Sequence, residues 1–72
     1  MTESQAFGLA KAIGGIPHHT GGGLWVVLFH RPNGEVVEIG DDGANVYRNL
    51  AHYGQGWQDD DRPEQITWEV AD

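Results

Sequence analysis

The chain has 72 residues and a formal net charge of −7, from eleven acidic and four basic side chains, and it contains no cysteine. This length predicts one domain over residues 1–72, and the lack of cysteine excludes disulfides, thiolate metal sites and a cysteine nucleophile. The acidity argues against direct binding to nucleic acid, because the phosphates would repel the carboxylates.

The acidic side chains are concentrated in the second half of the sequence. Residues 1–34 carry one acid against Lys11 and Arg31, whereas residues 35–72 carry ten acids against Arg48 and Arg62, a net charge of −8. A one-sided field of this size favours a basic partner, such as a protein surface that binds nucleic acid.

The first segment predicts a helix. Thr2 with Gln5 matches a capping box, and apolar residues follow at helical spacing from Ala6 to Ile13. Gly14 then favours a helix end, because glycine adopts the left-handed conformation at that position without strain. Residues 16–20 could form a short extended segment before the glycines at 21–23.

A hairpin is expected next. Residues 24–30 read Leu-Trp-Val-Val-Leu-Phe-His, a composition typical of a β-strand, and residues 35–39 predict a second strand. The Pro-Asn-Gly sequence at 32–34 favours a tight turn between them.

A second helix is predicted over residues 44–53. Asp41 or Asp42 could cap it, and Val46, Tyr47 and Leu50 would lie on one stripe. After a loop that holds Trp57, residues 66–70 alternate apolar and polar side chains as a half-buried strand does. The sum is a small α+β domain ordered helix, hairpin, helix, strand, with an antiparallel sheet of about three strands packed against two helices.

The strand at 24–30 is apolar on both faces, and two helices can cover only one of them. Trp25, Val27, Phe29 and Val36 would then lack a cover unless the loop around Trp57 folds over them. Self-association through Trp25, Val27 and Phe29 is one way to bury this face. A loop that lies across it is the alternative.

The carboxylates could together imitate the phosphates of nucleic acid and compete for a groove lined by lysine and arginine. The alternative is that they only keep a small protein soluble. Tyr53 and Trp57 are the expected apolar anchors beside the acids. The acidic candidates for partner binding are Asp41, Asp42, Asp59, Asp60, Asp61, Glu64 and Glu69.

Other chemistry finds little support in the sequence. The histidines lack the helical spacing of a zinc pair, and the glycines at 21–23 lead into a strand, whereas a phosphate loop leads into a helix. No serine elbow or catalytic triad is recognisable. We therefore expect no enzyme activity, no metal and no cofactor.

The sequence Gly-Gly-Gly-Leu-Trp-Val-Val leads into the hairpin, and the second predicted helix begins near Asp-Asp-Gly-Ala-Asn-Val-Tyr. With the small size, the acidity and the lack of cysteine, these features resemble the small accessory proteins of phages and mobile elements, and among them anti-CRISPR proteins. The resemblance implies an inhibitor that blocks target-DNA binding by a type I (Cascade) complex. The acidic candidates named above would carry this function.

Two further hypotheses remain open. One is a homo-oligomeric phage structural or accessory protein that associates through the Trp25/Phe29 face. The other is an antitoxin-like binder of another basic protein. The N-terminal residues lack a basic segment followed by an apolar one, and no apolar run approaches the ~20 residues of a membrane span, so a cytoplasmic location in a bacterial host is expected.

Overall fold

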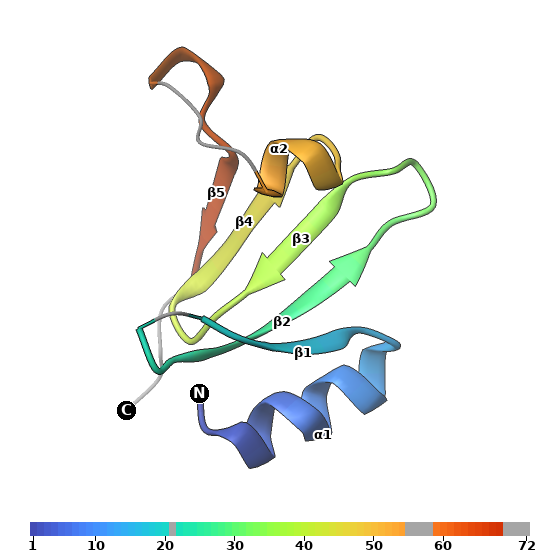
Figure 1. The fold of residues 1–72 in the computed structure, drawn as a ribbon, viewed down its shortest axis with the longest axis vertical. Helices are drawn as coiled ribbons and strands as arrows, with labels where there is room; N and C mark the ends of the chain where they lie inside the picture. Colours follow the sequence, from blue (N-terminus) through green and yellow to red (C-terminus); the bar gives the residue numbers. More distant parts are fainter. Residues whose placement is uncertain (21, 55–58, 69–72) are drawn as a thin grey trace.

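The computed structural model describes residues 1–20, 22–54 and 59–68. Five strands form one antiparallel sheet in the order β1-β2-β3-β4-β5, with helix α1 along one face and the short helix α2 beside one end of β4 (Figure 1). The elements are α1 Glu3–Ile13, β1 Ile16–His19, β2 Trp25–His30, β3 Val36–Ile39, β4 Gly43–Tyr47, α2 Leu50–Gly54, the 3-10 helix η1 Asp59–Asp61, and β5 Glu64–Thr67.

The predicted α+β class is confirmed, but the sheet has five strands where about three were expected. Each strand pairs antiparallel with the next one in the sequence, which gives a simple meander. Short connections are sufficient for this topology, because antiparallel neighbours need only a turn between them.

Helix α1 forms for the reasons that the sequence indicates. The Thr2 side chain accepts a hydrogen bond from the backbone N–H of Gln5 at 3.1 Å, and the Gln5 side chain accepts one from Thr2 N–H at 2.9 Å. Gly14 ends the helix with a φ of 74°. The inner face of the helix buries Ala6 and Ala10 against Val27 of β2, so α1 fixes one side of the core.

The predicted hairpin is also confirmed. Strands β2 and β3 pair with His30 opposite Val36 and Val27 opposite Ile39. The turn between them closes with a hydrogen bond from Gly34 N–H to the Arg31 carbonyl at 3.0 Å, and Gly34 has a φ of 94°. Glycine suits this position because it adopts positive φ without strain. The suggested extended segment at 16–20 is strand β1, which pairs with β2.

The helix predicted over residues 44–53 is wrong. Gly43–Tyr47 is strand β4, which lies between β3 and β5, and the helix of this region is confined to α2, Leu50–Gly54. The strand is favoured because β3 and β5 satisfy its backbone on both sides, and because Val46 and Tyr47 can then bury their side chains on opposite faces.

The last strand begins earlier than predicted. Strand β5 is Glu64–Thr67 and pairs with β4, whereas the predicted strand covered residues 66–70. Residues 69 and 70 lie outside the described part of the chain. No helix in that described part has the length and apolar character needed to cross a bilayer.

The predicted lack of cover over the strand 24–30 is also wrong in part. Helix α1 fully buries Val27, and Trp25 is half-buried with its ring 5.7 Å from that of Phe7. Val36 faces the opposite side of the sheet, where it packs with Leu28 and Tyr47 in a second core cluster. The predicted cover by Trp57 lies outside the described residues, and Phe29 remains partly exposed.

Candidate functional site

The predicted acidic residues lie in two groups. Asp41 and Asp42, here called the turn acids, occupy the turn between β3 and β4, at the lower left in Figure 1. Asp60, Asp61 and Glu64, here called the η1 acids, lie at η1 and at the start of β5. Since Gly43 pairs with Thr67 and Val46 with Glu64, the two groups are at opposite ends of the β4–β5 pair.

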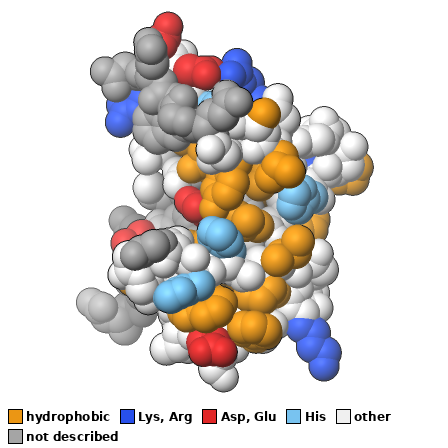
Figure 2. Space-filling view, in the orientation of Figure 1, with side chains coloured by type: hydrophobic (Ala, Val, Ile, Leu, Met, Phe, Trp, Pro, Cys, Tyr) orange, Lys and Arg blue, Asp and Glu red, His pale blue; other side chains and the backbone are white. Residues whose placement is uncertain are grey.

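Four residues of strand separate the two groups, which is roughly 13 Å at the usual rise per residue. In Figure 2 the acidic side chains likewise occur in separate places, while hydrophobic and histidine side chains fill the middle of the surface in view. The carboxylates therefore flank one edge of the sheet and do not form a single cluster.

Two of the predicted acids have partners within the chain. The Asp41 carboxylate lies 2.6 Å from the N-terminal ammonium of Met1, and the Asp61 carboxylate lies 2.6 Å from the guanidinium of Arg48. These ion pairs are solvent-exposed, so each adds little stability, but each reduces the negative field at its own site. The side chains of Asp42, Asp60 and Glu64 are exposed.

Two predicted candidates, and the side chain of a third, are outside the described part of the chain. Trp57 and Glu69 lie outside the described residues. The backbone of Asp59 belongs to η1, but its side chain is not described. The predicted anchor Tyr53 lies in α2, half-buried against Leu28, Val36 and Tyr47 of the second core cluster.

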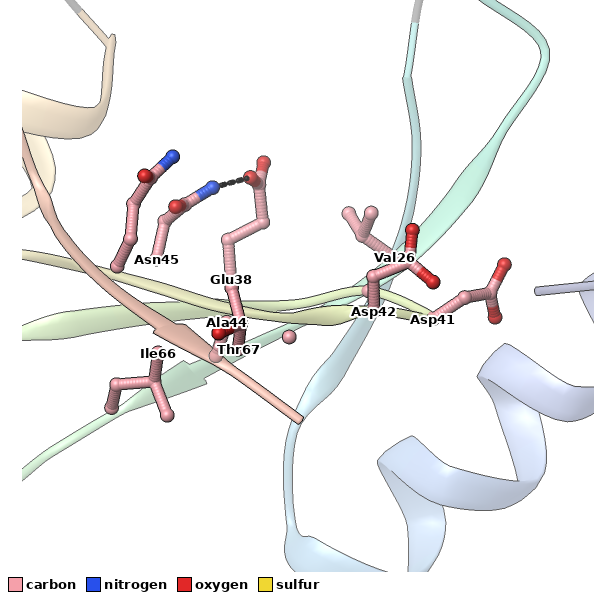
Figure 3. A pocket seen from close by; sticks show the side chains of 11 residues that line it. Val26, Glu38, Asp41, Asp42, Ala44, Asn45, Ile66 and Thr67 are labelled. Atoms are coloured by element: carbon pink, nitrogen blue, oxygen red, sulfur yellow. Dashed lines mark hydrogen bonds between the residues drawn. The ribbon is translucent and has the colours of Figure 1, made fainter. Parts of the chain in front are cut away.

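A pocket of about 280 Å³ lies on the sheet face opposite α1 and extends to the turn acids. Its carboxylates are Glu38, Asp41 and Asp42, and Val26 adds an apolar side chain to the lining (Figure 3). The pocket is therefore strongly acidic with a partly apolar wall. A lysine or arginine side chain combines a cationic head with an aliphatic stem and matches such a lining.

Glu38 is held in place by two hydrogen bonds. Its Oε1 accepts from the side-chain amide of Asn45 at 3.2 Å, drawn as the dashed line in Figure 3, and its Oε2 accepts from the Tyr53 hydroxyl at 3.1 Å. Burial, together with the negative charge and hydrogen bond of Glu38, raises the pKa of Tyr53 to about 12. The cluster thus keeps a fixed carboxylate next to a protonated tyrosine.

This arrangement is suited to binding a cation. The Glu38 carboxylate can accept further hydrogen bonds from a ligand, because each of its oxygens has more than one lone pair. Among the residues that the structure describes, no three His, Asp or Glu side chains come close enough to hold a metal ion.

His52 also has a structural role that the sequence did not reveal. Its ring is buried, Nδ1 accepts from the Arg48 backbone N–H at 3.1 Å, and Nε2 lies 2.6 Å from the Asp61 carbonyl oxygen. The first contact requires an unprotonated Nδ1, so the proton is on Nε2 and is donated to Asp61. His52 therefore ties η1 and its acids to the end of β4.

The cluster of Glu38, Asn45 and Tyr53 is not foreseen from the sequence, because the predicted helix over residues 44–53 includes Asn45. The alternation of Ala44, Asn45, Val46 and Tyr47 was the available signal. Interpreted as a strand, it would have placed Asn45 and Glu38 on the same face of a sheet.

Comparisons of the chain with protein-family models, with curated proteins and with solved structures found no match. The resemblance to anti-CRISPR proteins therefore stays a hypothesis that rests on size, charge and general form.

Proposed function

We propose that this protein is a non-enzymatic inhibitor that binds a basic, nucleic-acid-binding surface of another protein. The observation that carries the proposal is the pocket that Glu38, Asp41 and Asp42 line together with the apolar side chain of Val26. A lysine or arginine of the partner enters this pocket. The turn acids and the η1 acids then spread negative charge along the same edge of the sheet, where phosphates would otherwise lie on the partner.

The geometry of Glu38 supports binding over mere solubility. A carboxylate that only solvates the surface has no need of fixed partners, whereas Asn45 and Tyr53 hold Glu38 in one position. A preorganised acceptor loses less conformational entropy when a cationic side chain binds to it. The steering field of the remaining acids accelerates encounter with a basic partner.

The narrower form of the proposal is an anti-CRISPR protein that acts in the bacterial cytoplasm. It occupies the basic surface of a type I (Cascade) complex and keeps target DNA out. The likeness in size and acidity supports this form, and the pocket supports only the broader one.

The test is a competition assay between this protein and target DNA for a purified type I complex, repeated over a series of salt concentrations. Inhibition that fades as salt rises is expected, because screening weakens exposed charge pairs. The broader form is tested in parallel by binding to purified bacterial DNA-binding proteins with exposed basic grooves.

A variant that removes charge in the pocket and a control variant that removes charge on α1 test whether the pocket is the binding site. Glu38→Gln together with Asp42→Asn should weaken binding roughly ten-fold or more, as expected for loss of charge-assisted hydrogen bonds. Glu3→Gln removes one charge on α1, which does not line the pocket, and should change affinity less than about two-fold. Equal effects of the two changes would contradict the pocket as the site, and failure to bind any basic partner would overturn the function.

A further inference from the structure

Strand β5 is an edge strand of the described sheet, since β4 is its one neighbour among the described strands. Which of its backbone groups face β4 follows from one hydrogen bond, in which Trp68 N–H donates to the Asp42 carbonyl at 3.0 Å. In an antiparallel pair the backbone groups of alternate residues face the partner strand. Trp68 and Ile66 therefore face β4, while the N–H and C=O of Gln65 and Thr67 point outward.

The opposite edge of the sheet is protected. At β1, Thr20 N–H donates to the Leu24 carbonyl at 2.8 Å, so the same alternation turns Pro17 and His19 outward. Proline has no N–H to offer to a further strand, which is a common way to block edge pairing. No proline occurs within β5, so its outward N–H groups at Gln65 and Thr67 are intact.

The two faces of β5 differ in chemistry. Gln65 and Thr67 line the acidic pocket together with Glu38. On the other face Ile66 and Trp68 keep 47% and 43% of their surface exposed. The Trp68 indole is already held by a hydrogen bond from Nε1 to the Asp41 carbonyl at 2.9 Å, so its ring is ordered before any partner arrives.

We propose that β5 is a docking edge that takes up an extended basic segment of the partner as a sixth strand. The segment alternates basic and apolar residues. Its basic side chains lie on the pocket face, beside Gln65 and Thr67 and toward Asp42, and its apolar side chains lie beside Ile66 and Trp68. Main-chain hydrogen bonds to Gln65 and Thr67 supply affinity, and the alternation supplies specificity.

Charge complementarity decides between a basic segment and a second copy of this chain. Both ends of the edge carry exposed acids, Asp42 at one end and Asp60 and Glu64 at the other. Pairing of two β5 strands would bring these like charges together in two molecules that each carry a net charge of −7. The proposal rests on the proposed function, because both require a basic partner.

The first experiment uses the whole protein and a short synthetic peptide that alternates lysine and valine, with both ends blocked. A peptide of the same composition with its lysines and valines in separate blocks is the control. On addition of the alternating peptide, hydrogen exchange at the Gln65 and Thr67 amides, followed by NMR, should slow by about ten-fold or more. The block peptide should leave it unchanged.

Two substitutions at Gln65 distinguish the contribution of its backbone N–H from that of its side chain. Gln65→Pro removes an outward N–H and spares the hydrogen bonds to β4, whereas Gln65→Ala keeps the N–H and removes the side chain. The proline variant should bind the alternating peptide roughly ten-fold more weakly, and the alanine variant should bind within about three-fold of the parent. Circular dichroism checks that both variants fold.

The outcomes separate this inference from the broader function. If folded basic proteins bind with salt dependence while the Gln65 and Thr67 amides stay unprotected, strand addition is overturned and the function stands. Equal binding of the alternating and block peptides, or equal effects of the two Gln65 variants, would likewise overturn strand addition. If no basic peptide and no basic protein binds, both strand addition and the proposed function are overturned.

Discussion

At the scale of single residues, Tyr53 reports on the charge of Glu38. Its hydroxyl donates to Glu38, and its pKa is raised from 10.0 to about 12, first by burial and then by the negative charge of that carboxylate. Tyr47, the other tyrosine of the chain, also has a raised pKa, through burial and the same charge. Both phenols therefore stay protonated in the folded protein above the pH at which they ionise in the unfolded chain.

The first prediction concerns alkaline pH. Because the folded protein retains the Tyr53 proton while the unfolded chain loses it near pH 10, stability is full below pH 10 and falls between pH 10 and about 12. Glu38→Gln should lower the pKa of Tyr53 but leave it above 10, since burial is the larger cause. Ultraviolet titration of tyrosinate, with Tyr53→Phe to assign the two signals, measures both effects. A Tyr53 pKa unchanged by Glu38→Gln would contradict the contact.

The second prediction concerns His52. Replacement by alanine should lower the free energy of unfolding by about 2–3 kcal/mol, because it removes two part-buried hydrogen bonds, to Arg48 and Asp61, and opens a cavity at the buried ring. Denaturant unfolding measures this. His30→Ala, at the exposed end of β2, is the control and should change the free energy by less than about 0.5 kcal/mol. Equal effects would mean that His52 does not anchor η1.

At the scale of elements, substitution by alanine at Gly43 and at Gly8 should change the stability of the protein in opposite directions. A Cβ at Gly43 would overlap the carbonyl oxygen of Ile66 and lie 2.9 Å from the Cα of Thr67, so β4 and β5 would have to separate. Gly43→Ala should destabilise the protein by about 2 kcal/mol and loosen β5. Denaturant unfolding and hydrogen exchange in β5 measure the two effects. Unchanged stability would show that the strands approach less closely.

Gly8 lies inside α1 with nothing within 4 Å of the site of an added Cβ. Gly8→Ala should therefore stabilise the protein by up to about 1 kcal/mol, because alanine loses less backbone entropy than glycine in a helix. Thermal unfolding of the variant should show a higher midpoint than that of the parent protein. A fall would indicate that α1 makes a contact at Gly8 that glycine alone permits.

At the scale of the whole molecule, net charge governs stability in solution. A charge of −7 on a small domain is self-repulsive, and the exposed Met1–Asp41 and Arg48–Asp61 pairs offset little of it. Added sodium chloride should raise the thermal midpoint by a few degrees as it screens the repulsion. A midpoint that falls with salt would mean that the ion pairs outweigh the repulsion. The same salt that stabilises the free protein should weaken its complex with a basic partner.

Local signals in the sequence are sufficient to predict several elements of the fold. The cap at Thr2, the stop at Gly14 and the turn before Gly34 each act within a few residues, so α1 and the β2–β3 hairpin could be predicted. The acidic character was equally evident from the sequence alone. The surface positions of Asp42, Asp60 and Glu64 followed from it, since such carboxylates are rarely buried without partners.

The conformation of residues 43–47 and the arrangement of the acids depend on contacts between distant segments. Residues 43–47 carry apolar side chains that suit a helix stripe as well as a strand, and pairing with β3 and β5 on both sides selected the strand. That choice brought Asn45 to Glu38 and separated the turn acids from the η1 acids. Pairing between distant segments depends on register and burial across the whole sheet, which no local pattern encodes.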